Sequence, residues 1–125
     1  MSNLQLLKAE SSNVQEEKTP IKSTLINYPG MAKIIAEFLK ELPAEIENLR
    51  AYLSKGDLTS LRRLVHQLRG TCGGYGFGAV TAVAAAAEDA IDSGQDGESI
   101  AARVESLIQI IRRIEGCDQL EKHVA

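Results

Sequence analysis

Residues 58–78 read LTSLRRLVHQLRGTCGGYGFG, and this stretch holds both the clearest helix of the chain and its clearest break. Its apolar residues recur every three or four positions, which predicts an amphipathic helix with one buried face. That face consists of Leu58, Leu61, Leu64, Val65, Leu68 and Cys72. Asp57 stands at the N-cap position, where its side chain can accept a hydrogen bond from a backbone amide of the first turn. The glycine-rich run at 73–78 ends the helix, so the stretch predicts a helix followed by a tight turn.

Three further stretches, at about 31–54, 79–93 and 98–115, show the same spacing of apolar residues. Pro43 lies inside the first of them, but the apolar phase continues through it. We therefore expect one bent helix there, or two abutting ones, and not a loop. Four amphipathic helices with short connections predict an all-α fold, an antiparallel up-down four-helix bundle over residues 28–116 with an N-terminal extension.

The two ends of the chain are polar and are expected to lie outside the bundle. Residues 1–27 are interpreted as a flexible leader and residues 117–125 as a C-terminal tail. Ile21, Leu25 and Tyr28 are the residues that could lay the last part of the leader against the body of the protein.

Composition excludes several classes of protein. The chain has 125 residues and a formal net charge of −3, which fits one domain with no basic block for nucleic acid. It has no apolar run long enough for a membrane span and no signal-peptide pattern. Cys72 and Cys117 are far apart and lack metal-ligand spacing, so reduced thiols in a cytoplasmic protein are expected. The apolar stripes suffice to fill one bundle, which favours a monomer.

One polar residue of the 58–78 helix stands out. On a helical wheel His66 lies roughly 140° from the centre of the apolar stripe, which places it on the solvent side. Arg62 is four residues before it and Arg69 three after, so both are its neighbours on the helix surface. The positive charge of Arg69 suits a phosphoryl group, and Arg62 is expected on the surface that a partner would approach.

The same face carries glycines, at positions Gly70, Gly73 and Gly74. Each glycine inside a helix costs about 1 kcal/mol relative to alanine, and the sequence shows no folding benefit that would offset this. A face without side chains would let the backbone of another protein approach the imidazole. Two simpler interpretations stay open at this point, because an exposed helical histidine is usually only solvated and a glycine cluster near a helix end is usually a turn.

Residues 65–77, VHQLRGTCGGYGF, closely resemble the phosphorylation motif of histidine-containing phosphotransfer (HPt) domains and the corresponding domain of chemotaxis histidine kinases. In that pattern a basic residue follows the histidine at plus three, glycine at plus four and glycine at plus ten. His66, Arg69, Gly70 and Gly76 stand at those places. The family more often has lysine where this chain has Arg69, which keeps the charge on a planar fork. The resemblance covers about residues 28–115.

The resemblance implies that His66 accepts a phosphoryl group from the aspartyl phosphate of a response-regulator receiver domain and passes it to another receiver. It also implies that Glu88 orients the imidazole. Antiparallel pairing about Phe77 would independently put His66 and Glu88 at one level, although Glu88 could still be an ordinary surface carboxylate. A hybrid sensor or a chemotaxis-type histidine kinase is a further expected partner.

The chain is expected to need no cofactor or metal of its own, because the receiver would bring the Mg²⁺. The glycine-rich run GTCGGYGFG lacks the Lys-Ser/Thr ending of a phosphate-binding loop, so ATP binding and autophosphorylation are not expected. Two alternatives remain: a docking module that carries no phosphate, and a substrate domain phosphorylated directly by a separate kinase core. A Cys72 nucleophile is disfavoured, because Cys72 belongs to the core stripe and reactive thiols need exposure.

Overall fold

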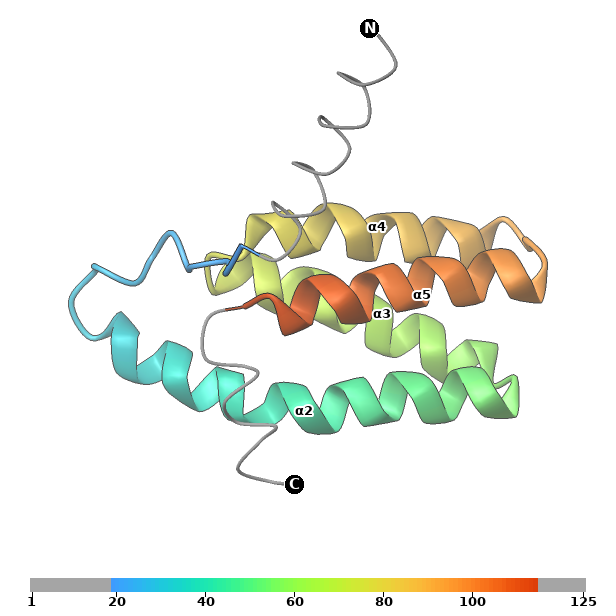
Figure 1. Cartoon of the computed structure of the whole chain (residues 1–125), viewed down its shortest axis with the longest axis horizontal. Coiled ribbons are helices and arrows are strands. Elements are labelled where there is room, and N and C mark those ends of the chain that lie inside the picture. The colour runs from blue at the N-terminus through green and yellow to red at the C-terminus, as the bar shows by residue number, and fades with distance from the viewer. Residues whose placement is uncertain (1–18, 115–125) are drawn as a thin grey trace, which may run out of the picture.

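A computed structural model describes residues 19–114 of the chain, and this part is entirely helical apart from its turns and one isolated bridge between Ile21 and Ile114. Expectations for residues 1–18, for the tail and for Cys117 fall outside this range. Successive helices run in opposite directions (Figure 1), which confirms the predicted antiparallel bundle. The helices are α2 (Met31–Lys55), α3 (Leu58–Gly74), α4 (Gly78–Asp92) and α5 (Gly97–Arg112).

The ends of the helices have local causes, and one of them, the Asp57 cap, was predicted from the sequence. α2 ends where Gly56 takes a positive φ of 69°, a conformation that glycine adopts without strain. The Asp57 side chain then accepts a hydrogen bond from the Ser60 amide and begins α3, as predicted. Asp96 caps α5 in the same way through the Ser99 amide.

α2 is one continuous helix although Pro43 lies inside it, which is the first of the two predicted forms, one bent helix and not two abutting ones. A proline ring cannot donate to the helical ladder and crowds the carbonyl of the preceding turn, so the helix bends (Figure 1). Leu42 and Ile46 beside the bend are fully buried. Burial of this apolar face offsets the hydrogen bond that proline removes.

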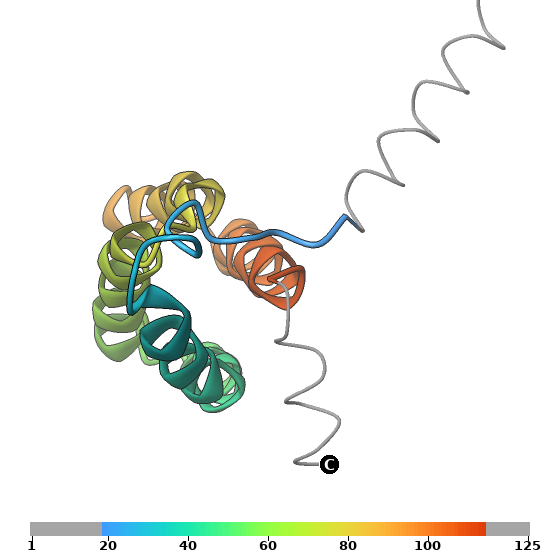
Figure 2. The same cartoon turned by 90° about the vertical axis from the view of Figure 1, so that its left-hand side faces the viewer.

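The four helices enclose one core, as the end-on view in Figure 2 shows. α3 packs most closely on α4, α4 packs on α5, and α2 contacts both α3 and α5. α4 can approach its neighbours closely because three of its buried side chains, Ala84, Ala87 and Ala90, are small. The largest buried side chains are Phe77, Leu42, Ile46, Leu49, Leu61, Leu68, Leu107, Ile108, Ile111 and Ile114.

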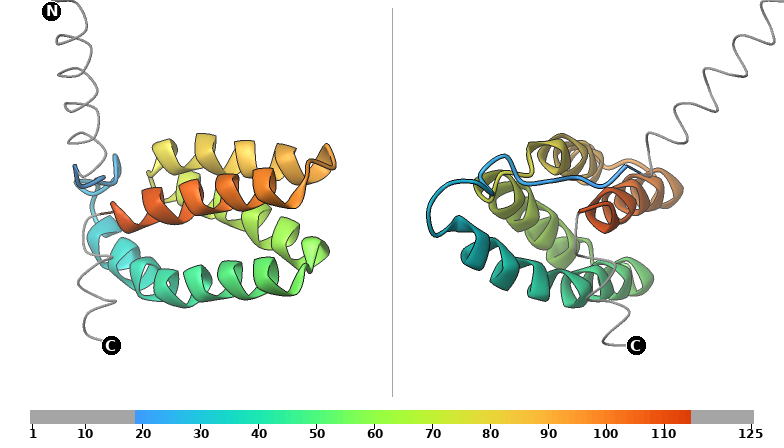
Figure 3. Two further views of the ribbon diagram at one scale, coloured as in Figure 1. Left: turned by 45° about the vertical axis from the view of Figure 1, so that its right-hand side comes forward. Right: turned by 60° about the vertical axis from the view of Figure 1, so that its left-hand side comes forward.

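The segment before α2 crosses one end of the bundle, where α5 ends and α3 turns into α4 (Figure 3). The Ile21 amide donates to the Arg113 carbonyl beyond α5 at 2.7 Å. Further along, the Thr24 amide donates to the Gly76 carbonyl in the turn between α3 and α4 at 3.0 Å. We call residues 19–30 the strap, because they join the end of α5 to the turn after α3.

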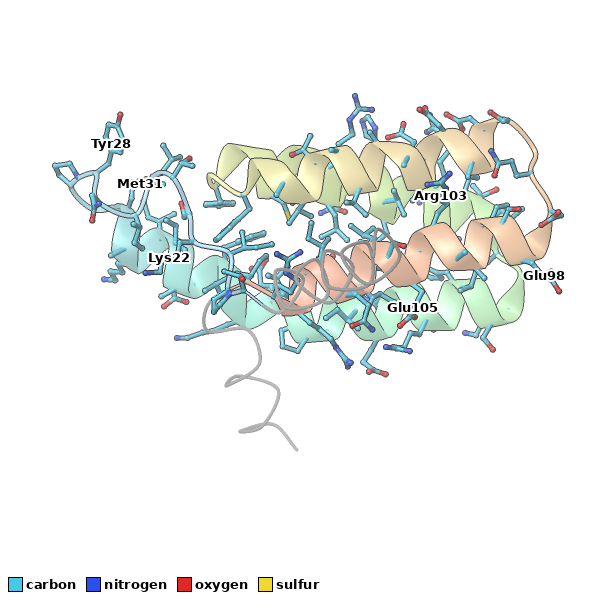
Figure 4. The ribbon with its side chains drawn as sticks, turned by 45° about the horizontal axis from the view of Figure 1, so that its top comes forward. Lys22, Tyr28, Met31, Glu98, Arg103 and Glu105 are labelled. Carbon is cyan, nitrogen blue, oxygen red and sulfur yellow. The ribbon has the colours of Figure 1, made fainter. Side chains whose placement is uncertain are left out.

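The strap overlaps the last part of the leader that was expected over residues 1–27. Residues 19–27 are therefore fastened to the bundle, by backbone hydrogen bonds that an apolar pattern does not reveal. Ile21 and Leu25 pack against the core, as anticipated. Tyr28 does not: its side chain points away from the bundle (Figure 4) and the residue is 63% exposed.

Candidate functional site

His66 lies on the outward face of α3, and its side chain is 64% exposed. Its neighbours Val65 and Leu68 are buried in the core. The helical phase read from the sequence is therefore confirmed, and His66 is a histidine that another molecule can reach.

Glu88 of α4 lies directly opposite His66 across the α3–α4 pair. The Nδ1 atom of His66 is 3.1 Å from each carboxylate oxygen of Glu88. An ionised carboxylate only accepts, so this contact is a hydrogen bond when Nδ1 carries the proton. Only 7% of the Glu88 side chain is exposed, so the alternative of an ordinary surface carboxylate is wrong.

Two arginines of α3 reach the same carboxylate. Arg69 Nη1 lies 3.4 Å from Glu88 Oε1, and Arg62 Nη2 lies 3.2 Å from Glu88 Oε2. Glu88 therefore accepts from up to three donors, which matches the hydrogen-bonding capacity of a buried carboxylate. Arg69 and His66 therefore contact the same carboxylate of Glu88.

Asp92 completes the cluster, although no pattern in the sequence singled it out. Arg62 Nε donates to Asp92 Oδ1, and Arg62 Nη2 lies 3.2 Å from Asp92 Oδ2. Arg62 was expected on a partner-access surface, but it is committed to two carboxylates of α4. The register could have revealed this pair, because Arg62 is one turn before His66 and Asp92 is one turn after Glu88 on antiparallel helices.

The three glycines expected to open this face have two different roles. A Cβ atom on Gly70 or Gly74 would meet nothing within 4 Å, so these positions are open to an approaching molecule. A Cβ on Gly73 would lie 2.8 Å from the Oγ1 atom of Thr81 on α4. The expectation that Gly73 brings no folding benefit is therefore wrong, because it permits the close approach of α3 and α4.

The charges around Glu88 set its ionisation. Burial raises the pKa of the Glu88 carboxyl group, but the hydrogen bond and charge of His66, together with Arg69 and Arg62, outweigh burial and lower it. The hydrogen bond from Arg62 likewise lowers the pKa of Asp92. Both carboxyl groups are thus held in the charged form that their cationic partners require.

The lowered pKa of Glu88 predicts a pH-dependent contribution to stability. A group whose pKa is lower in the folded state stabilises the fold above its unfolded pKa, and this contribution is lost as the pH falls through the folded value. We expect Glu88→Gln to be less stable than the parent at pH 7, and the gap to narrow below about pH 4, the usual range of a glutamate. Urea unfolding at a series of pH values measures this difference in the free energy of unfolding. A gap that stays constant down to pH 3 would contradict the prediction.

Further features of the described part of the chain are its metal-ligating side chains, the apolar content of its helices and the cysteine at position 72. Residues 19–114 contain no group of three or more His, Cys, Asp or Glu side chains that could hold a metal ion. No helix there has the length and apolar content needed to cross a membrane. Cys72 is fully buried, as its place in the core stripe predicted.

Comparison with known proteins gives one finding. A family model described as Hpt domain matches residues 33–122, which include all of α3, α4 and α5 and most of α2. Neither the search of curated proteins nor the search of solved structures returned a match.

Proposed function

The chain belongs to the Hpt domain family, and from this premise we propose that it is a phosphorelay carrier whose phosphate-bearing residue is His66. Membership of the family assigns it a histidine phosphotransfer role in two-component signalling, as a carrier and not a kinase. In the proposed reaction His66 accepts the phosphoryl group from the aspartyl phosphate of one receiver domain. It then passes the group to the aspartate of another receiver.

One observation carries this proposal. The side chain of His66 is exposed to solvent, yet its Nδ1 atom contacts the buried carboxylate of Glu88. With its proton on Nδ1, the imidazole has its lone pair on Nε2. This lone pair attacks phosphorus, the bond from phosphorus to the aspartyl oxygen breaks, and the receiver aspartate leaves as a carboxylate. No proton has to leave the ring. Glu88 offsets the positive charge that the ring gains.

Arg69 supplies a second charge in this scheme. Its guanidinium touches Glu88 at 3.4 Å, at the long end of hydrogen-bond distances, so little is lost when it turns to the phosphoryl oxygens. Mg²⁺ would be held by the receiver, and the carrier itself would need no cofactor. We place this exchange in the cytoplasm, with the carrier acting as a monomer that forms brief complexes with receivers.

The experiment that tests the function is transfer from a panel of radiolabelled, phosphorylated receiver domains to the folded chain. Acid-labile, alkali-stable label on the chain supports the proposal, and the fastest donor identifies the pathway. A second arm offers a histidine kinase core with ATP in place of the receivers. Label from the kinase core alone would favour the directly phosphorylated substrate domain, and no label in either arm would favour the docking-only module.

Gly70 provides a prediction about the docking face. A side chain there meets open space, so Gly70→Gln should keep or raise the stability of the helix, by up to about 1 kcal/mol. The same side chain would stand one turn from His66 in the path of a receiver. We expect transfer to slow about tenfold, equivalent to about 1.4 kcal/mol.

Gly97→Gln is the matched control, because Gly97 also meets nothing within 4 Å but begins α5 at the opposite end of the bundle from the α3–α4 turn. Initial transfer rates and urea unfolding of both variants measure the effect. Equal transfer rates for the two variants would show that Gly70 is not part of the docking face.

A further inference from the structure

We propose that Arg62, anchored by Asp92, is a positioning residue for His66 that acts through Glu88. The inference rests on the proposed function, because it explains how Glu88 keeps its orientation when Arg69 turns to a phosphoryl group. The inference gives a role to Arg62, one turn before His66 on α3, and to Asp92, one turn after Glu88 on α4.

The geometry makes Arg62 a bridge between two carboxylates of one helix. Its Nε and Nη2 atoms face the two oxygens of Asp92, and Nη2 also lies 3.2 Å from Glu88 Oε2. A planar guanidinium held on two sides in this way has little rotational freedom. It fixes one oxygen of Glu88, while the Nδ1 atom of His66 lies 3.1 Å from both oxygens.

Arg69 is held differently. Within residues 19–114 its guanidinium bonds only Glu88, at 3.4 Å, whereas Arg62 has two carboxylate partners. The cation that can leave at the lowest cost is therefore Arg69. A buried carboxylate that loses a partner needs another to remain charged and in place, and Arg62 supplies it.

The two arginines thus have different roles. Arg69 is the mobile cation that can follow the phosphoryl group, and Arg62 is the fixed cation that holds Glu88 before and after transfer. Loss of Arg62 would leave Glu88 with His66 alone at the moment when Arg69 moves, so the imidazole would lose its fixed tautomer and orientation.

The test compares Arg62→Gln and Asp92→Asn with Arg63→Gln, which removes an exposed arginine from the same helix and gives the same net charge as Arg62→Gln. The first readout is the ¹⁵N signal pair of the His66 ring in the unphosphorylated protein, at a pH where the ring is neutral. The second is the initial rate of transfer from a phosphorylated receiver. Amide spectra confirm that each variant is folded.

We expect Arg62→Gln to lower the fraction of the Nδ1-protonated tautomer and to slow transfer about tenfold, with a smaller change in the same direction for Asp92→Asn. Arg63→Gln should match the parent in both. Arg62→Lys should rescue only part of the rate, because an ammonium group cannot bridge two carboxylates side-on.

The two readouts separate this inference from the function on which it rests. A parent chain that takes no phosphate from any donor would end the proposed function, while the ring signals would still report whether Arg62 positions His66. Ring signals and rates for Arg62→Gln that equal those of Arg63→Gln, in a parent that does carry phosphate, would overturn the inference alone.

Discussion

Replacing His66 by glutamine is expected to remove all phosphoryl transfer to this chain while leaving the bundle folded. A glutamine amide has no lone pair on nitrogen that can attack phosphorus, so label should fall to the background of the assay. The fold should survive because 64% of the side chain is exposed. The buried Glu88 would keep Arg62 and Arg69 as partners, so it would not become an isolated buried charge.

The chain offers a matched control for this variant, because it contains only two histidines and the second is His123. His123→Gln should take up phosphate as the parent does. Acid-labile label is measured after incubation with a phosphorylated receiver, and urea unfolding shows that both variants are folded. Label that persists in His66→Gln and disappears in His123→Gln would mean that the acceptor was assigned to the wrong residue.

The fold could be predicted from the sequence because each helix carries its own signals. The apolar stripe of α3 and the Asp57 cap fix that helix without reference to any other part of the chain. Short connections then leave antiparallel packing as the simple solution. Pro43 did not mislead, since the apolar phase continues on both sides of it.

The site could be predicted only in part, because a helical wheel shows which face a residue occupies but not what lies opposite. His66 and Glu88 were paired correctly by counting from the turn, and the structure brings them together. Asp92 escaped notice because a charged residue near a helix end looks like solvated surface. The same counting, extended by one turn, would have paired Asp92 with Arg62.

Gly73 and the strap show a different limit of prediction from the sequence. The role of Gly73 depends on Thr81, a partner on another helix that no local pattern reveals. The strap is fastened by backbone hydrogen bonds at Ile21 and Thr24, and backbone groups are the same for every sequence. A largely polar segment therefore indicated a leader, although its last part belongs to the folded body.

Gly76→Ala is expected to have the largest effect on stability of any glycine substitution in the described part of the chain. Gly76 has a φ of +89°, which strains any residue with a Cβ atom. That atom would also lie 2.5 Å from Ser23 Oγ and 3.0 Å from the amide nitrogens of Thr24 and Leu25. Backbone strain alone costs about 1–3 kcal/mol. With the strap pushed away, we expect a total loss of about 2–4 kcal/mol.

Gly78→Ala is the control, because Gly78 has no positive φ and a Cβ there meets nothing within 4 Å. Alanine at this first residue of α4 should leave stability unchanged or raise it by up to about 1 kcal/mol. Urea unfolding of both variants measures the difference.

The clash at Gly76 has a side-chain part and a backbone part, and Ser23→Ala separates them. Ser23 Oγ donates to the Tyr75 carbonyl at 2.6 Å and accepts from the Leu25 amide at 3.0 Å, so Ser23→Ala alone should destabilise the strap. In a chain that already carries Gly76→Ala, the same change removes the closest clash and should cost less. The double variant should therefore be more stable than the sum of the two single changes predicts. Strict additivity, or a Gly76→Ala protein as stable as the parent, would show that the strap does not rest on this glycine.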